Sequence, residues 1–362
     1  MRPRALVLSA LSLGSGSGLR ALYLARALRR LGWDALLVHP RGGPLPYNGE
    51  IFTALPRHVA AACGRFDLAV GVKPYPDAWA GLALARLLGA TCVVDVDDDD
   101  GGYRGGLIGG LGGLIQAPAY ALAHCASTHH PLLKERLVDR LGPGRVVDLA
   151  QGVDLDVFNA AALRAGRKAW RRNLGWSDST VLAFTAHLNI ACQLDLLLDV
   201  LGPWLRAHPK AVLAVAGSGP MEGRFRRLAS PLGGSVRFLG AVTPEGAAQC
   251  LAGSDCLVSA YGPSQGNRFR VPMKVAESLA MGLPVVSNLV PGLEELKAFM
   301  HVSPLEPAAY GKALDGALRH GRARAERGRT WVRRRLDWTL VAGRFLGQVR
   351  KRRTLPKGGG EA

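Results

Sequence analysis

The stretch that decides the fold covers residues 268–287 and reads RFRVPMKVAESLAMGLPVVS. Its second half predicts a helix that ends near Gly282, because Val275 and Leu279 recur at helical spacing and glycine commonly follows a helix end. Pro284 then opens a short apolar strand. Cationic side chains and a helix N-terminus are therefore expected beside the end of a preceding strand. Open α/β sheets bind ligands at this place, and a helix N-terminus attracts anions such as phosphate.

The rest of the chain alternates strand patterns with helical patterns. Strands are predicted at residues 6–9, 33–39, 66–72, 91–96, 181–185, 212–216, 236–239 and 255–260. Helices are predicted at residues 19–31, 56–63, 77–89, 194–205 and 244–251, and residues 305–348 read as further helices. This alternation predicts parallel sheets with right-handed crossovers, and a length of 362 residues suits two domains.

The chain is strongly basic, with 46 Lys and Arg against 28 Asp and Glu and a formal net charge of +18. This charge fits a solvated basic surface, an anionic membrane face, a polyanionic substrate or a nucleic acid. Nucleic-acid binding is not expected, because aromatic residues do not interleave with the basic ones. The six cysteines form no C-x-x-C pair, so we expect buried thiols in a reducing compartment.

The N-terminal segment favours a first strand over a signal peptide, because its apolar run is short and is followed by glycines and an amphipathic helix. Residues 105–126 lack charged side chains and are the one candidate for a membrane span, but they contain many glycines and Pro118. We expect a cytoplasmic protein without a spanning helix. Its arginine-rich C-terminal helix suits a peripheral position on the inner face of the membrane.

A glycine-rich loop follows the first predicted strand. Gly14, Gly16 and Gly18 allow the backbone to approach a ligand, and the next helix presents unpaired N–H groups toward it. The spacing is G-x-G-x-G, which departs from the dinucleotide-binding fingerprint G-x-G-x-x-G. An ordinary flexible turn is the alternative.

An acidic segment, residues 95–100, follows the strand at residues 91–96. Crowded carboxylates repel one another unless a cation, a proton or a hydroxyl network intervenes. The alternatives are a metal site, a solvated acidic turn and an acceptor site. Residues 101–113 are rich in glycine and predict either a mobile loop over a substrate or a disordered insert. His129 and His130 are expected at the end of a later strand, where they are either site residues or exposed loop histidines.

These motifs resemble the retaining glycosyltransferases of family four, also called glycosyl transferases group 1, which have the GT-B fold. The likeness is nearly unbroken over residues 212–295. Its centre is a subgroup pattern P-x-K-x-x-E-x-L-A-x-G, which is matched by Pro272, Lys274, Glu277, Leu279, Ala280 and Gly282. A second pattern, G-V-D-x-x-x-F, is matched by Gly152, Val153, Asp154 and Phe158. The family typically has two glutamates separated by seven residues, of which Glu277 fills the second position and Phe269 stands at the first.

The resemblance implies a nucleotide-diphosphate-sugar donor, and it assigns residues to the donor's phosphates. The family usually supplies an arginine and a lysine after the second domain's first strand, but residues 187–195 contain neither. Arg268, Arg270 and Lys274 are the available cations, and two charge-assisted hydrogen bonds of about 1.5–3 kcal/mol each are enough to replace that pair. A basic surface cluster is the alternative. The expected donor-binding residues are Gly14, Gly16, Gly18, His187, Gly217, Arg268, Arg270, Lys274 and Glu277.

The sequence therefore predicts a nucleotide-sugar-dependent glycosyltransferase with two Rossmann-like, doubly wound parallel-sheet domains facing a cleft. The expected divisions are an acceptor-side domain at 1–160, a nucleotide-sugar domain at 161–325, a helix at 326–349 returning to the first domain, and a basic disordered tail at 350–362. Catalytic roles fall to Asp97, Lys274 and Glu277, with no metal or other cofactor and with a glycan, lipid or small molecule as acceptor. The alternatives are an inactive binding or scaffold protein of the same fold and a basic protein that binds nucleic acid or a membrane surface.

Overall fold

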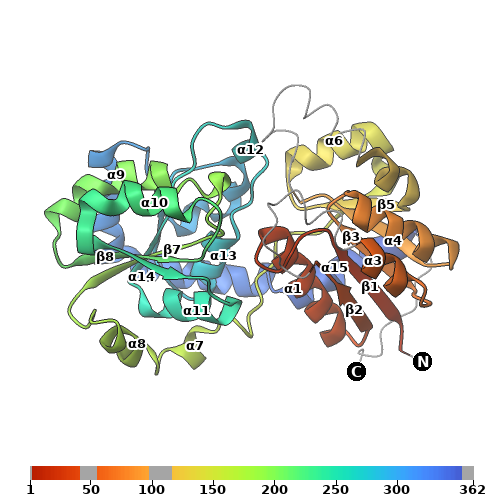
Figure 1. The fold of residues 1–362 in the computed structure, drawn as a ribbon, viewed down its shortest axis with the longest axis horizontal. Helices are drawn as coiled ribbons and strands as arrows, with labels where there is room; N and C mark the ends of the chain where they lie inside the picture. Colours follow the sequence, from red (N-terminus) through yellow and green to blue (C-terminus); the bar gives the residue numbers. More distant parts are fainter. Residues whose placement is uncertain (1, 41–54, 98–115, 353–362) are drawn as a thin grey trace. The chain divides into compact units, whose positions relative to one another are not determined.

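The computed structural model describes residues 2–40, 55–97 and 116–352. The chain forms two compact units, which Figure 1 shows. Unit 1 comprises Met1–Gly152 and Trp338–Ala362, and unit 2 comprises Val153–Asp337. The chain therefore passes from one unit to the other twice.

Unit 1 is built on a six-stranded parallel sheet in the order β2-β1-β3-β4-β5-β6. The strands are β1 (Arg4–Ser9), β2 (Asp34–Val38), β3 (Leu68–Val72), β4 (Thr91–Asp95), β5 (Cys125–Thr128) and β6 (Val146–Asp148). The helices are α1 (Gly16–Arg30), α3 (Leu55–Ala62), α4 (Pro76–Leu87), α6 (Pro131–Leu141), the 3-10 turn η1 (Pro143–Arg145) and α15 (Trp338–Arg352). Strands β3, β4 and β5 are buried at every position, as expected when helices cover both faces of a parallel sheet.

Unit 2 repeats this architecture with a six-stranded parallel sheet in the order β12-β11-β10-β7-β8-β9. The strands are β7 (Thr180–Thr185), β8 (Ala211–Ala216), β9 (Val236–Gly240), β10 (Cys256–Val258), β11 (Val285–Ser287) and β12 (His301–Val302). The α-helices are α7 (Ala160–Leu163), α8 (Arg167–Asn173), α9 (Leu194–Ala207), α10 (Glu222–Ala229), α11 (Pro244–Gly253), α12 (Gln265–Arg268), α13 (Met273–Ala280) and α14 (Pro307–Arg335). The 3-10 helices are η2 (Ile190–Cys192), η3 (Ser230–Ser235) and η4 (Pro291–Phe299). Two sheets of this kind confirm the predicted Rossmann-like organisation.

Each unit has its own apolar core. In unit 1, side chains of β1 and β4 such as Leu6 and Val94 are fully buried and cluster with Leu82 of α4. In unit 2, Phe184 of β7 and Leu197 of α9 belong to a separate cluster. Helix α14 packs against α9 and α13, and α15 packs against α1. The last helix is therefore part of unit 1, although its sequence follows unit 2.

The boundaries of the units differ from those predicted by sequence. The divisions lie after Gly152 and after Asp337, where we expected them after residues 160 and 325. Helix α14 belongs wholly to unit 2, so only α15 returns. Helix α14 packs against α9 and α13 of unit 2, and the Val153 N–H donates to the Leu336 carbonyl over 2.6 Å where the two crossing segments meet.

Two predicted segments are more ordered than expected. Helix α1 starts at Gly16, inside the predicted glycine-rich loop, because Ser15 caps it. Residues 350–352 form the last turn of α15, where Arg352 donates to the Gly144 carbonyl over 2.7 Å and to the Val146 carbonyl over 2.9 Å. The rest of the predicted tail, residues 353–362, lies outside the described residues.

Within the described ranges, none of the helices has both the length and the apolar character needed to span a bilayer. The candidate span at 105–126 is described only from residue 116, where a short helix covers residues 116–122 and is followed by β5. The glycine-rich segment 101–113 and residues 98–100 of the acidic segment lie outside the described residues.

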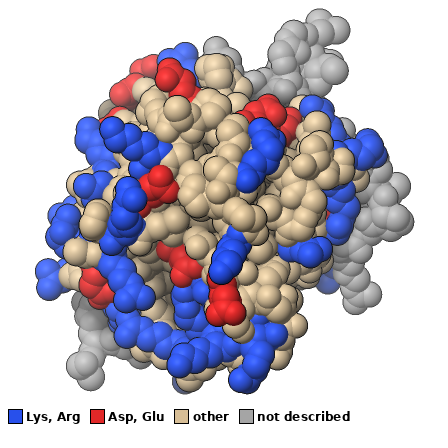
Figure 2. Space-filling view, turned by 90° about the vertical axis from the view of Figure 1, so that its left-hand side faces the viewer, with Lys and Arg blue, Asp and Glu red and all other residues tan. Residues whose placement is uncertain are grey.

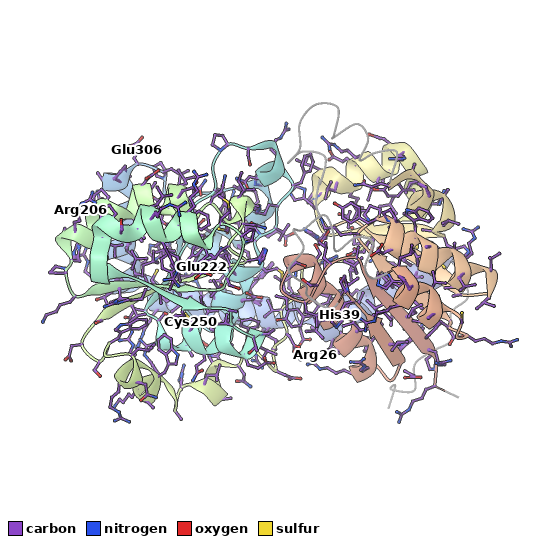
Figure 3. The ribbon with its side chains drawn as sticks, in the orientation of Figure 1. Arg26, His39, Arg206, Glu222, Cys250 and Glu306 are labelled. Atoms are coloured by element: carbon purple, nitrogen blue, oxygen red, sulfur yellow. The ribbon has the colours of Figure 1, made fainter. Side chains whose placement is uncertain are left out.

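The basic charge and the cysteines can be followed on the surface and in the interior. Figure 2 shows Lys and Arg side chains along the lower rim and left edge of the face it presents, with fewer Asp and Glu among them. Five cysteines are buried and Cys63 is exposed. Cys250 of α11, labelled in Figure 3, is 1% exposed, and burial raises the pKa of its thiol to about 12. The five buried thiols agree with the sequence expectation, and exposed Cys63 departs from it.

Gly18 is required by a close backbone approach at the start of α1. A Cβ at this position would lie 2.0 Å from the Ser12 carbonyl oxygen, whereas a Cβ on Gly14 would meet only the Ser12 hydroxyl at 4.0 Å. The Gly18 N–H also donates to Oγ of Ser15 over 3.1 Å. Gly14 before α1 and Gly18 in its first turn therefore have different steric demands.

We expect Gly18→Ala to lower the free energy of unfolding of unit 1 by about 1–3 kcal/mol, because overpacking against backbone forces the chain to move. Gly14→Ala should change it by less than about 0.5 kcal/mol and serves as the matched control. Urea unfolding followed by circular dichroism measures both values. Equal unfolding midpoints for the two variants would contradict this steric account.

Candidate functional site

Helix α13 presents a cation and a carboxylate on one face. Lys274 and Glu277 are three residues apart, which places their side chains together on a helix. The Lys274 ammonium lies 3.9 Å from the ring centroid of Phe184, a residue of β7 next to its carboxyl end. Glu277 is 8% exposed. The predicted pair is therefore largely removed from water at the carboxyl edge of the unit 2 sheet.

Burial shifts the pKa of each member of this pair toward neutrality. Burial is the largest influence on Lys274 and lowers its pKa to about 8. The Cys192 thiol and the Glu277 carboxylate oppose this shift, whereas the Arg270 guanidinium adds to it. Burial raises the pKa of Glu277 to about 7, against the influence of Lys274. Between these two values the charged form of each group predominates. A ligand that bears a diphosphate would meet a protonated Lys274 at neutral pH.

Arg270 fixes the segment before α13 to the loop after β7. Its guanidinium donates to the Ala191 carbonyl, and it lies over the Tyr261 ring with 5.7 Å between the guanidinium carbon and the ring centroid. Arg270 also acts on the pKa of Lys274, so the structure brings these two predicted cations together. Arg268 is exposed on α12, and Phe269 is 2% exposed.

Gln193 joins the same two loops and was missed by sequence reasoning. Its backbone is left-handed with φ of 53°, which is uncommon for a residue with a side chain. Its Oε1 accepts from the Gly262 N–H and from the Asn267 side-chain amide, each over 2.8 Å. No motif marks this residue, because its partners lie far along the chain.

Gly217 and His187 lie where the loops after β7 and β8 meet. Gly217 has φ of +136°, and a Cβ there would lie 1.8 Å from the Ala186 carbonyl oxygen. The Leu188 N–H donates to the Ser218 carbonyl over 2.9 Å, which holds the loops together through backbone. His187 is half-buried beside this junction. The two residues therefore lie at the carboxyl ends of β7 and β8, on the same edge of the unit 2 sheet as Phe184.

In unit 1, Asp97 lies at the carboxyl edge of the sheet and is paired with Lys73. Lys73 Nζ is 3.2 Å from Asp97 Oδ1, and the side chains are 3% and 10% exposed. Burial acts to raise the pKa of Asp97, but Lys73, a hydrogen bond from Ser17, Arg20 and His129 together hold it below its usual value. Because Ser17 lies between Gly16 and Gly18, the structure brings Asp97 to the predicted glycine loop.

The acidic segment is neutralised in part by the protein's own cations. Arg20 binds Asp95 through Nε at 2.6 Å and Nη2 at 3.1 Å, and the Ser127 hydroxyl donates to Asp95 over 2.7 Å. Arg20 also donates to the Leu149 carbonyl over 2.6 Å and lies over the Trp338 ring. Among the described residues no group of three or more His, Cys, Asp or Glu is arranged to hold a metal ion.

The sequence patterns single out Asp97, Lys274 and Glu277 as candidates but not the residues that surround them in the structure. Lys73 pairs with Asp97 itself, Arg20 pairs with the neighbouring Asp95, and Gln193 accepts from Gly262 in the loop before α12, each from a distant part of the chain. The available signal for Lys73 was its place directly after a buried strand, where parallel sheets present ligand-binding side chains. His129 follows β5 and acts on the pKa of Asp97, which places it at the same edge.

The sequence model of the family described as Glycosyl transferases group 1 matches residues 179–320. This chain carries a group 1 glycosyltransferase domain. The matched range lies within unit 2 and contains Lys274 and Glu277, together with His187, Gly217, Arg268 and Arg270. The group 1 resemblance that the sequence patterns carry is thereby confirmed.

Two curated relatives extend this comparison. A GDP-mannose-dependent monoacylated alpha-(1-6)-phosphatidylinositol monomannoside mannosyltransferase of Corynebacterium glutamicum is 30% identical over 41% of this chain and 39% of the relative. A GDP-mannose-dependent alpha-(1-6)-phosphatidylinositol dimannoside mannosyltransferase of Mycobacterium tuberculosis is 29% identical over 44% of this chain and 39% of the relative. The matches thus span well under half of each curated relative.

The solved structures show that the likeness in fold extends over both units. Anabaena Alr3699/HepE in complex with UDP-glucose matches with a TM-score of 0.73 and 16% identity, over 96% of this chain and 99% of that chain. The group 1 glycosyltransferase domain therefore belongs to a two-unit GT-B fold, as the sequence predicts.

We expect the double variant Lys274→Met/Glu277→Gln to be more stable than the wild type at pH 7.5, by about 1 kcal/mol or more, since burying charges costs solvation. The raised pKa of Glu277 stabilises the fold below about pH 4.5, and this contribution is lost as pH rises through about 7. The lowered pKa of Lys274 stabilises the fold above about pH 10.5, and this contribution is lost as pH falls through about 8. Neither contribution is present in full at pH 7.5.

Urea unfolding at pH 7.5 measures this difference. The matched control is Lys297→Met/Glu294→Gln, which removes an exposed pair at 2.8 Å in the same unit and should change stability by less than about 0.5 kcal/mol. A Lys274/Glu277 double variant that is less stable than wild type would show that the pair stabilises the fold.

Proposed function

We propose that this chain is a glycosyltransferase that moves a sugar from a nucleotide-diphosphate-sugar donor to a hydroxyl of a glycan, lipid or small-molecule acceptor, with retention of the anomeric configuration. The observation that carries the proposal is the largely buried Lys274 beside Glu277 and Arg270 at the carboxyl edge of the unit 2 sheet. The donor class is supported by the two curated relatives, which are named as GDP-mannose-dependent. A lipid-linked acceptor is supported by the phosphatidylinositol mannosides in the same names.

The chemistry asks the protein to stabilise a leaving diphosphate. As the bond between sugar and phosphate breaks, positive charge develops on the sugar ring and negative charge on the diphosphate. Lys274 and Arg270 would bind the diphosphate, and interactions that strengthen as its charge grows lower the barrier. His187 and the Gly217 turn would line the donor site beside Phe184. Glu277 would bind a hydroxyl of the ribose or the transferred sugar.

The acceptor is assigned to unit 1. Asp97 is a buried, ionised carboxylate beside the glycine loop, and it would accept a hydrogen bond from the acceptor's hydroxyl. Gly16 and Gly18 flank Ser17, which donates to Asp97, so the loop would shape this part of the site. We propose that Asp97, Lys274 and Glu277 together carry catalysis.

A binding protein without activity is the second candidate. Phe269 is 2% exposed at the position where the resemblance places the first glutamate, so that carboxylate is missing from the donor side. Such a protein would bind a nucleotide sugar without cleaving the bond between the sugar and the diphosphate. Product detection by mass spectrometry therefore separates the two candidates.

We expect Lys274→Met to weaken binding of GDP or UDP by about tenfold or more, because a charge-assisted hydrogen bond contributes about 1.5–3 kcal/mol. Isothermal titration with GDP, UDP, GDP-mannose and UDP-glucose identifies the donor and measures the affinity. Lys297→Met removes an exposed lysine of the same unit and should bind as wild type does. The proposal fails if no nucleotide binds the wild type or if Lys274→Met binds equally well.

We expect excess EDTA to leave nucleotide binding and sugar transfer unchanged, because Lys274 and Arg270 supply the positive charge that a metal ion supplies elsewhere. Titration and product detection with and without chelator measure this. Loss of binding on chelation, with recovery on adding Mg²⁺ or Mn²⁺, would show that a metal ion takes part.

A further inference from the structure

Lys73 combines two energetically costly features at the carboxyl end of β3. Its backbone is left-handed, with φ of 70°, which side chains disfavour. Its ammonium is buried, with the side chain 3% exposed, and lies 3.2 Å from Asp97. The Lys73 N–H donates to the Asp95 carbonyl over 3.0 Å, which holds the strained backbone against β4. Strained residues of this kind persist where the surrounding structure fixes them, and they cluster at functional sites.

The described polar and titratable groups around Asp97 come from four elements. Lys73 follows β3, Ser17 and Arg20 belong to α1, His129 follows β5, and Asp95 ends β4. Arg20 is committed to Asp95 through two contacts of 2.6 and 3.1 Å, so Lys73 is the cation paired directly with Asp97. Burial, then the Arg20 charge, holds the pKa of His129 well below its usual value, although Asp97 opposes this, so the imidazole is neutral.

Within the described residues, the cluster contains as many cations as carboxylates. Two cations, Arg20 and Lys73, face two carboxylates, Asp95 and Asp97. A phosphate or carboxylate group would meet no uncommitted cation among these four residues. An uncharged hydroxyl can donate to the fixed Asp97 carboxylate without disturbing the balance, because an ionised carboxylate only accepts hydrogen bonds.

We propose that Lys73 is a positioning residue for the acceptor, which holds Asp97 as an immobile, ionised carboxylate that accepts a hydrogen bond from an uncharged acceptor hydroxyl. The inference rests on the proposed function for the transfer reaction itself. It deepens that function by assigning a role to Lys73 and by limiting the reacting group of the acceptor to a neutral hydroxyl. Any anionic part of the acceptor would have to be bound by other residues.

The first test is a titration of Asp97 in the full chain. Carboxyl ¹³C NMR of aspartate-labelled protein follows its protonation, with Asp97→Asn identifying the signal. We expect the pKa of Asp97 to rise by about one unit or more in Lys73→Met and to return toward wild type in Lys73→Arg, because an adjacent cation lowers a carboxyl pKa. Lys134→Met is the control, since Lys134 pairs with exposed Asp148 in the same unit. An unchanged Asp97 titration in Lys73→Met would overturn the proposal.

The second test separates positioning from a purely structural ion pair. Nucleotide release is measured with GDP-mannose or UDP-glucose, whichever binds, using water and a panel of neutral sugars as acceptors. We expect Lys73→Met to lose about tenfold or more in turnover with the donor Kd unchanged, and Lys73→Arg to recover most of it. In Lys73→Met/Asp97→Asn the stability should recover while turnover stays low.

The outcomes are distinct. Recovery of both stability and turnover in the double variant would show that the pair is structural only and overturn the proposal. Wild-type turnover in Lys73→Met would also overturn it. If the wild type binds no nucleotide, the proposed function fails, and the role of Lys73 in transfer fails with it. If only the proposed role of Lys73 fails, the wild type still binds the donor nucleotide through Lys274. The two failures are therefore distinguishable.

Discussion

Parallel pairing is the constraint on which the rest of the molecule depends. Every strand pair in both sheets is parallel, so the carboxyl ends of all strands in a unit lie along one edge. Segments that are distant in sequence meet there. In unit 1 this edge gathers Ser17, Lys73, Asp97 and His129, and in unit 2 it gathers Gly217, Gln193 and the segment that leads into α13. The crossover helices begin at the same edge, which adds their unpaired N–H groups.

Both candidate sites contain features that reduce stability. Among the described residues, Lys73 and Gln193 are the two non-glycine residues with positive φ, and each lies at a candidate site. Buried charges occur at both places as well, with Lys274 and Glu277 in unit 2 and Lys73 and Asp97 in unit 1. The buried apolar strands and their covering helices must offset these costs. Unfavourable backbone conformations and buried charges that the surrounding fold holds in place cluster at functional sites.

Much of the fold could be predicted from apolar runs and their spacing. The predicted strands at 91–96 and 212–216 correspond to β4 and β8 within one residue at each end, because fully buried parallel strands read as continuous apolar segments. Lys274 and Glu277 could be paired because both lie on one predicted helix. The unit boundaries were less predictable. They depend on the packing of α14 within unit 2 and on long-range pairing such as that of Val153 with Leu336, which no local pattern shows.

By itself the sequence determined the fold class, the two units and the face of α13 that carries a cation and a carboxylate, since these follow from local periodicity and spacing. Only the tertiary structure decided which charges are neutralised and which residues hold the sites. Lys73 meets Asp97, Arg20 meets Asp95, and Gln193 meets Asn267 across long separations in sequence. Burial sets the pKa of Lys274 and Glu277 near neutrality, and burial is a property of the packed chain. The physical reason is that desolvation and long-range ion pairing exist only once the strands have brought their carboxyl ends together.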